Sequence, residues 1–168
     1  MMTYDAAYWV KALGLTPHPE GGYYKETYRS EDVISQSALP GRFAGERSCC
    51  TSIFYLLESG DFSAFHKICS DEIWHFYAGD PLELRVLSSE GLVSVTLGHD
   101  VAAGQHLQYV VPAQAWFAAY PASGSRFSLL GCTVSPGFDF ADFTRAKRSE
   151  LIAEFPKEQR IISSLTRE

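Results

Sequence analysis

The chain has 168 residues and a formal net charge of −6, and it contains no basic run that would displace counterions from phosphates, so we expect no nucleic-acid partner. Hydrophobic residues make up 46% of it and charged residues 20%, which predicts a packed core within one domain over residues 1–168. The N-terminus has no basic leader and no window approaches the roughly 18 apolar residues of a membrane span, so we expect a cytoplasmic protein without membrane contact.

The first predicted element is a short helix that Asp5 caps and Gly14 ends. Two prolines and a glycine pair follow, and an alternation of tyrosines with charged and polar residues then predicts a strand that starts near Tyr23. The segment 30–48 has no sustained period and collects Ser, Pro, Gly and charged residues. We interpret it as a long surface loop that is able to cover a site.

From Cys50 onward, short β-prone runs alternate with Gly, Asp, Ser or Pro at the spacing expected of a sandwich or barrel. The tail regains helical spacing, and Pro156 marks the start of the second of two short predicted helices. The cysteines show no CxxC spacing, so we expect them to be reduced and mostly buried; they are Cys49, Cys50, Cys69 and Cys132.

The segment FHKICSDEIWHFYAG, residues 65–79, carries two histidines and two acidic residues among aromatic ones. With Gly60 before it, the anchors His66, Ile68, Glu72 and Gly79 stand at the spacing G-x5-H-x-I-x3-E-x6-G. This pattern resembles the first motif of the cupin superfamily, G-x5-H-x-H-x3-4-E-x6-G, with Ile68 in place of the second histidine. The later stretch PAQAWF resembles the second cupin motif, P-x-G-x2-H.

In that second stretch Pro112 is kept, Gln114 stands in place of the glycine, and Phe117 stands in place of the histidine. The wider pattern of HPEGGYYKETYRS, DEIWHFYAGDPLEL, PAQAWFAA and GCTVSPGFDFADF is similar to an uncharacterised cupin family of unknown function. The resemblance extends from about Thr16 to Ile162. It implies an all-β fold, a double-stranded β-helix or cupin jelly-roll barrel, with a short N-terminal helix and C-terminal helices.

In the superfamily, the two histidines and the glutamate of the first motif bind a metal together with the histidine of the second. Two of these four positions are apolar here, and a transition metal needs at least three protein ligands. We therefore predict no cofactor, while a divalent metal held by a non-standard set that adds His106 or Glu26 stays open as an alternative. The resemblance also implies a homodimer that pairs through sheet edges.

Because side chains alternate across a strand, His66 and Ile68 share one face, and Glu72, Trp74 and Phe76 share another. By the resemblance these faces point into the barrel, whereas His75 and Tyr77 point outward. A pocket with aromatic walls and few polar groups is typical of a small-molecule site. The predicted walls are Ile68, Trp74, Phe76, Trp116 and Phe117, with plain core packing as the alternative for the tryptophans.

We expect His66 to act as a base or anchor and Glu72 to orient it, on a sugar-like or heterocyclic metabolite. Whether any reaction is catalysed stays open. The first alternative is an enzyme proper. It is either a divalent-metal enzyme with the non-standard ligand set, or an epimerase that uses His66 as the base and a tyrosine as the acid. The candidate tyrosines are Tyr24, Tyr28, Tyr55 and Tyr109. The second alternative is a structural or storage-like protein. We expect Arg47 and Arg126 to lie on the surface, with neutralisation of Glu72 or contact with an anionic ligand as the alternative for either residue.

Overall fold

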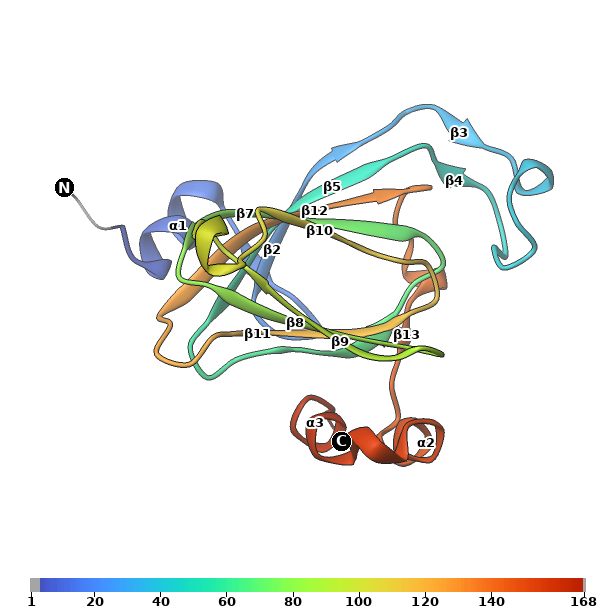
Figure 1. Ribbon diagram of the computed structural model, residues 1–168. Coiled ribbons are helices and arrows are strands. Elements are labelled where there is room, and N and C mark those ends of the chain that lie inside the picture. The colour runs from blue at the N-terminus through green and yellow to red at the C-terminus, as the bar shows by residue number, and fades with distance from the viewer. Residues whose placement is uncertain (1–3, 168) are drawn as a thin grey trace.

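The computed structural model describes residues 4–167 and shows two β-sheets that face each other as a barrel, with helices outside them (Figure 1). The all-β jelly roll with an N-terminal helix and C-terminal helices is as predicted. The helices are α1 (Ala6–Leu13), α2 (Arg148–Glu154) and α3 (Gln159–Ser164), with the 3-10 turns η1 (Gln36–Ala38), η2 (Val101–Ala103), η3 (Phe140–Asp142) and η4 (Pro156–Glu158). None of the helices within residues 4–167 is long and apolar enough to cross a bilayer.

The upper sheet of Figure 1 has six strands in the order β1-β2-β5-β12-β7-β10. They are β1 (Thr16–Pro17), β2 (Tyr23–Arg29), β5 (Thr51–Glu58), β12 (Phe127–Ser135), β7 (Asp71–Gly79) and β10 (Gln108–Val111). The lower sheet has five strands in the order β13-β6-β11-β8-β9. They are β13 (Thr144–Arg145), β6 (Ser63–Lys67), β11 (Trp116–Pro121), β8 (Leu82–Ser88) and β9 (Gly91–Leu97).

Helix α1 has the capping chemistry that its sequence predicts. The Asp5 carboxylate accepts a hydrogen bond of 2.8 Å from the backbone N–H of Tyr8, and Gly14 ends the helix at a φ of 65°. A side chain at that φ would be strained, so glycine is the natural terminator. The apolar face of the helix packs on the outer side of β5 and β12, in a cluster that includes Leu15, Leu56 and Phe127.

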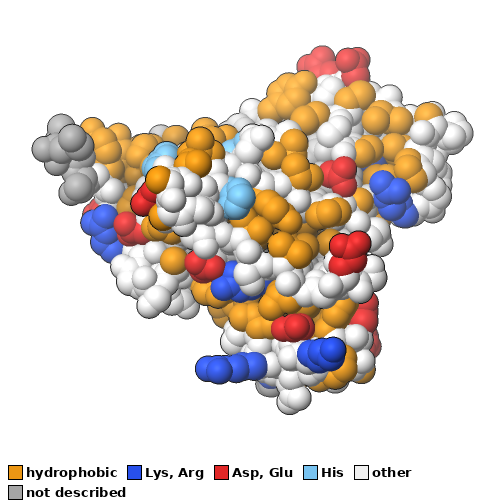
Figure 2. Space-filling view, viewed as in Figure 1, with side chains coloured by type: hydrophobic (Ala, Val, Ile, Leu, Met, Phe, Trp, Pro, Cys, Tyr) orange, Lys and Arg blue, Asp and Glu red, His pale blue; other side chains and the backbone are white. Residues whose placement is uncertain are grey.

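The C-terminal helices cover the outer face of the five-stranded sheet (Figure 1). Leu151 of α2 and Ile162 of α3 are fully buried there against Phe65 of β6 and Leu87 of β8. On the face drawn in Figure 2, acidic and basic side chains are interspersed around these helices instead of forming one continuous charged surface. The tail therefore contributes an apolar layer to the barrel, as the helical spacing predicts.

The barrel interior is packed at one end by rings and aliphatic side chains from both sheets. Trp74 and Leu130 come from the six-stranded sheet, Leu84 and Phe117 come from the five-stranded sheet, and all four are almost completely inaccessible to solvent. The other end of the interior is not filled in this way. That end contains a cavity between the two sheets.

The segment 30–48 differs from the loop that was expected. It forms a small hairpin of β3 (Val33–Ile34) and β4 (Arg47–Ser48) that projects past the end of the barrel (Figure 1), and none of its residues lines the cavity. The expectation that Arg47 lies on the surface is wrong. Its side chain is only 6% exposed, and the guanidinium pairs with Asp142 through two hydrogen bonds of 2.7 and 2.5 Å. The pairing spans 95 residues, so local sequence could not reveal it.

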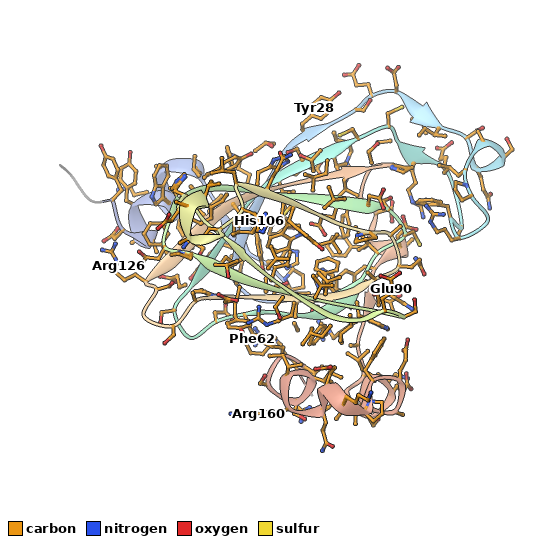
Figure 3. All side chains as sticks on the ribbon, viewed as in Figure 1. Tyr28, Phe62, Glu90, His106, Arg126 and Arg160 are labelled. Atoms are coloured by element: carbon orange, nitrogen blue, oxygen red, sulfur yellow. The ribbon has the colours of Figure 1, made fainter. Side chains whose placement is uncertain are left out.

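Other expectations about single residues agree with the structure. Arg126 is exposed at the tip of the barrel (Figure 3), as predicted, and it pairs with Asp80. His75 points outward and contacts the Thr133 hydroxyl at 3.2 Å. The cysteines are free thiols; Cys69 and Cys132 are buried, whereas Cys49 and Cys50 are half-buried.

Candidate functional site

The open end of the barrel contains a cavity of about 450 Å³ between the two sheets. Strands β2, β5, β6, β7 and β12 provide its walls, and the segment 138–143 covers its mouth. The lining residues are His18, Tyr24, Glu26, Arg29, Thr51, Ile53, His66, Ile68, Glu72, Cys132, Val134, Phe138, Asp139, Phe140 and Phe143. Three of the predicted site residues, namely His66, Ile68 and Glu72, are thus brought together.

Strand register explains why these side chains meet. Across the six-stranded sheet, Arg29 pairs with Thr51, Thr51 with Val134, and Val134 with Glu72, so one row of side chains crosses the cavity wall. Residues directly opposite each other in neighbouring strands project on the same face. The row therefore brings Glu72 to the same wall as Arg29, Thr51 and Val134, which are distant from it in the chain.

A β-bulge in β2 turns a charged pair toward the cavity. The register with β5 shifts between Glu26 and Tyr28, and the extra residue flips the side-chain alternation after it. Glu26 and Arg29 consequently share the inner face and form a salt bridge of 2.7 Å. Arg29 also donates to the Phe138 carbonyl at 3.1 Å. This cation is thus already engaged by the protein at the mouth.

His66 is fixed by its own strand. Its Nδ1 lies 2.7 Å from the Ala64 carbonyl, and because a carbonyl only accepts, Nδ1 carries the proton in the neutral ring. Nε2 is then an acceptor, and it forms no hydrogen bond with the protein within residues 4–167. Phe143 stacks on the ring at 5.1 Å. Burial lowers the pKa of His66 to about 4, helped by the Arg145 charge and opposed by the Ala64 hydrogen bond.

His18 is the second histidine on the cavity, and sequence reasoning missed it. Its Nδ1 accepts a hydrogen bond of 3.1 Å from the backbone N–H of Glu20, so the neutral ring carries its proton on Nε2. Tyr24 meets the ring edge-on at 4.8 Å. Burial, together with the nearby His66, lowers the pKa of His18 to about 4. The cavity therefore offers one histidine as a donor and the other as an acceptor.

Glu72 is the acidic group inside the cavity wall, and its side chain is almost fully buried, at 8% exposed. Burial raises the pKa of Glu72 to about 7, and the neighbouring Cys132 thiol and Trp74 indole offset part of this rise. The Trp74 Nε1 atom has no hydrogen-bond partner. The indole N–H is therefore a polar neighbour of the Glu72 carboxyl and does not donate a hydrogen bond to it. Near neutral pH the carboxyl is partly protonated.

The expectation that Glu72 orients His66 is wrong for this structure. The Ala64 carbonyl holds the Nδ1 side of the imidazole, and within residues 4–167 no hydrogen bond or ion pair joins Glu72 to His66. The carboxyl and the imidazole instead reach the cavity from different sheets, since His66 belongs to β6 and Glu72 to β7. Each group is thus available separately to a ligand.

The predicted aromatic walls are placed differently from expectation. Trp74, Phe76 and Phe117 face the interior, but they belong to the packed core and are absent from the cavity lining. Trp116 points outward and packs beneath the C-terminal helices with Leu87. Adjacent strand residues must face opposite sides, so an inward Phe117 forces Trp116 outward. The aromatic walls come instead from Tyr24 and the segment 138–143.

Only some of the candidate tyrosines and candidate third metal ligands line the cavity. Of the four tyrosines, Tyr24 lines the cavity, whereas Tyr28 points away from the barrel (Figure 3), and the Tyr55 hydroxyl is buried and donates to the Gly21 carbonyl at 2.8 Å. Tyr109 packs against the core and does not line the cavity. Glu26 reaches the cavity but His106 does not.

The family assignment agrees with this architecture. The description "Cupin superfamily (DUF985)" matches residues 7–146, which is most of the chain. The chain belongs to this cupin family. A curated relative, the uncharacterized protein YML079W of Saccharomyces cerevisiae, is 31% identical over 142 residues, which cover 79% of this chain and 71% of the relative.

Two solved structures match nearly the whole length of this cupin chain. A hypothetical protein from Leishmania major has a TM-score of 0.87 and 35% identity, with 98% of this chain and 100% of that one covered. Protein SO0799 from Shewanella oneidensis has a TM-score of 0.87 and 37% identity, with 98% and 99% covered. Oxalate decarboxylase from Bacillus subtilis is similar in fold alone, with a TM-score of 0.53 and 13% identity over 89% of this chain and 36% of that one.

The two cupin motifs have changed in different ways. Gln114, which replaces the motif glycine, keeps a left-handed backbone with a φ of 66°. Its backbone N–H and its side-chain amide both donate to the Ile68 carbonyl, at 2.9 and 3.2 Å, and these bonds offset the strain of a non-glycine residue there. The turn of the motif therefore survives without its glycine.

Only half of the metal ligands of the two motifs are present in this chain. Within residues 4–167, no group of three or more His, Cys, Asp or Glu side chains stands close enough to hold a metal ion. Ile68 and Phe117 present hydrocarbon where the motif has histidines, and His66 and Glu72 alone remain of the four positions. This donor set of the described residues does not fit the superfamily metal.

Proposed function

We propose that this cupin binds a small, neutral, planar metabolite in the cavity between its sheets. The observation that carries the proposal is a hollow end of the barrel whose wall presents three polar groups without charge partners, namely His18, His66 and Glu72. A cavity of about 450 Å³ falls within the range of about 300–1,000 Å³ that is typical of small-molecule sites.

The charge balance around the cavity favours a neutral ligand. Arg29, the one Lys or Arg among the residues that line the cavity, is paired with Glu26, and the two arginines Arg47 and Arg145 are paired with Asp142 and with the buried Glu20. A phosphate or diphosphate would find no unpaired cation among the lining residues to compensate its loss of hydration. A sugar-nucleotide substrate, as in the epimerase alternative, is therefore poorly supported.

The walls favour a flat ligand. Phe143 stacks on the His66 ring at an interplanar angle of 27°, and Phe140 at the mouth is more than half exposed. Aromatic rings prefer offset stacking or edge contacts with a planar guest. In this proposal the rings of the segment 138–143 stack on the ligand, which is the role that was expected of Trp74 and Trp116.

Thermal-shift measurements with two panels of probes test the proposal. One panel contains neutral nitrogen heterocycles and the other contains neutral monosaccharides. A probe at ten times its Kd stabilises the folded chain by about 1.4 kcal/mol, which raises Tm by a few degrees. We expect shifts with heterocycles in the wild type and in Thr133→Phe, which alters the outer face, but none in Val134→Phe, which fills the cavity. Equal shifts in both variants would place binding elsewhere.

A second candidate, an isomerase that moves a carbon-bound proton, is favoured by Tyr24, which is the one candidate tyrosine on the cavity. Within this alternative Glu72 is a better base than His66, because a pKa near 7 suits proton transfer at neutral pH and a pKa of about 4 does not. Deuterium uptake by D-ribulose and D-fructose in D₂O, lost in Glu72→Gln and Tyr24→Phe, would support it.

The homodimer stays a proposal. The outer face of the six-stranded sheet carries exposed apolar residues beyond the reach of α1, among them Tyr77 on β7 and Val110 on the edge strand β10. Edge strands of this kind are often covered by a second copy. Light scattering of the purified chain, compared with Val110→Lys, measures the oligomeric state.

A further inference from the structure

The Glu72 carboxyl differs from the other buried acidic groups in having no cationic partner. The buried Glu20 accepts from Arg145 and the buried Asp142 accepts from Arg47. None of the ion pairs formed within residues 4–167 includes Glu72, although its side chain lies deep in the cavity wall. A buried carboxyl without a cation is most easily kept as the neutral acid.

A neutral carboxyl has a distinctive hydrogen-bonding pattern. One oxygen carries a proton and donates, and the other accepts, so the two oxygens form an adjacent donor and acceptor in one plane. A lactam has the complementary edge, because its ring N–H stands next to its C=O. A trans secondary amide turns its N–H away from its C=O, and an ether has no donor, so each of them offers only half of this pattern.

Resting on the proposed function, we propose that the ligand is a planar heterocycle with a lactam edge, and that the protonated carboxyl of Glu72 pairs with that edge. The Glu72 hydroxyl donates to the lactam carbonyl and its carbonyl oxygen accepts from the ring N–H. Further polar atoms of the ring have two partners in the same cavity: His18 Nε2–H as a donor and His66 Nε2 as an acceptor.

Two other ligand classes fit the same walls less well. An anion would lie against Glu72 without a free cation among the cavity-lining residues, since Arg29, the one Lys or Arg in that lining, is engaged by Glu26 and by the Phe138 carbonyl. An amidine-like cation would pair with an ionised Glu72, and its binding would strengthen as pH rises. The lactam pairing has the opposite pH dependence, because it needs the proton on Glu72, whose pKa is near 7.

NMR titrations with 2-pyridone and N-methyl-2-pyridone test the pairing. The two probes share one ring and one carbonyl, but methylation removes the ring N–H. We expect 2-pyridone to bind the wild type at least tenfold more tightly than the N-methyl compound at pH 5.5. Its affinity should fall about 30-fold between pH 5.5 and pH 8.5, as the carboxyl with a pKa of about 7 ionises.

Variants at one position separate pairing from shape. Glu72→Gln keeps a donor and an acceptor in the same plane, so it should bind 2-pyridone with an affinity that does not change with pH. Glu72→Met keeps the length without polar atoms and should bind both pyridones equally weakly. His75→Gln on the outer face is the matched control and should behave as the wild type.

Three results would overturn the inference. They are equal binding of the two pyridones to the wild type, affinity for 2-pyridone that rises with pH, and preference for benzamidine over 2-pyridone at pH 8.5. If neither pyridone binds but other neutral probes still shift Tm in a Val134-dependent way, the lactam fails and the proposed function stands. If no probe of either panel binds in the cavity, both fail.

Discussion

The two ends of the barrel interior are built from the same strands but differ in what fills them. On β12, Leu130 lies at the packed end between Tyr55 and Phe76, and Val134 lies at the open end between Thr51 and Glu72. The backbone pairing is continuous from one to the other. The hollow therefore reflects side-chain size and polarity and not a break in the sheet.

The difference shows how a barrel divides structural from functional positions. Rings from both sheets, such as Trp74 and Phe117, meet at the packed end and exclude water. At the open end the row from β5, β12 and β7 consists of the smaller or polar side chains of Thr51, Val134 and Glu72, and the Glu72 carboxyl has no cationic partner among the described residues. Substitutions at the two ends should accordingly change different quantities, stability at one and ligand affinity at the other.

The largest expected loss of stability follows from breaking the buried ion pair between Arg47 and Asp142, which lies at the open end. Arg47→Ala leaves the buried Asp142 carboxylate without its partner, and removing one member of a buried pair costs about 3–5 kcal/mol of unfolding free energy. Chemical denaturation measures the loss. Arg126→Ala breaks an exposed pair with Asp80 and should cost about 0–1 kcal/mol. Equal losses would show that the Arg47 pair does not hold the mouth of the cavity.

At the packed end, Leu130→Ala should destabilise the chain by about 2–5 kcal/mol, because it removes a fully buried side chain and leaves a void. Urea unfolding of the variant gives the number. The 2-pyridone affinity of the folded variant should stay within twofold of the wild type, since Leu130 does not line the cavity. A large loss of affinity with little loss of stability would contradict the division between the two ends.

The stability of the open end should depend on pH through Glu72. The pKa of Glu72 is about 7 in the folded chain against an ordinary 4.5, so the unfolded chain loses the proton first as pH rises. Stability is then lost progressively from about pH 4.5 to 7. Glu72→Gln removes this term, and its unfolding free energy relative to wild type should rise by about 3 kcal/mol across that window.

The titration of His18 and His66 does not affect the difference in stability between the wild type and Glu72→Gln. Their pKa values are lowered to about 4, so both proteins lose stability as pH falls from about 6.5 toward 4, and this loss cancels in the difference. Unfolding curves at half-unit intervals from pH 4 to 8 are required. A difference that stays flat with pH would mean that Glu72 titrates as an ordinary exposed carboxyl.

Among the substitutions inside the barrel, the smallest loss of stability is expected at Val134. Val134→Ala removes two methyl groups that already border open space, so the loss should be about 1 kcal/mol, well below that of Leu130→Ala in the same strand. Differential scanning calorimetry resolves a change of this size. A loss equal to that of Leu130→Ala would indicate that the open end is packed as tightly as the other.

Local rules predicted much of this fold. Asp5 and Gly14 define α1 because capping depends on neighbours a few positions away, and alternation correctly separated Glu72 from His75. The same alternation should have excluded Trp116, since Phe117 beside it takes the inward place. The motif register fixed which face His66 occupies, and the structure brings it to the cavity with Glu72.

Other features depended on long-range pairing that no local pattern records. His18 reaches the cavity through a turn closed by the His18 and Gly22 backbones, and Arg29 does so through a bulge whose position depends on β5. The segment 138–143 is fixed by the Arg47 and Asp142 pair. The HPEGG stretch, with a histidine beside two prolines, was the one local signal that could have marked His18 as more than a turn residue.

A crystal soaked at pH 6 with a mixture of 2-pyridone and other small neutral heterocycles gives the most direct test of the central claim, that the open end of the barrel is a ligand site. The account predicts electron density for a flat ring between Glu72 and His66, with the packed end unchanged. Density for fragments on the outer surface alone, with rings of the segment 138–143 turned inward to fill the cavity, would contradict it.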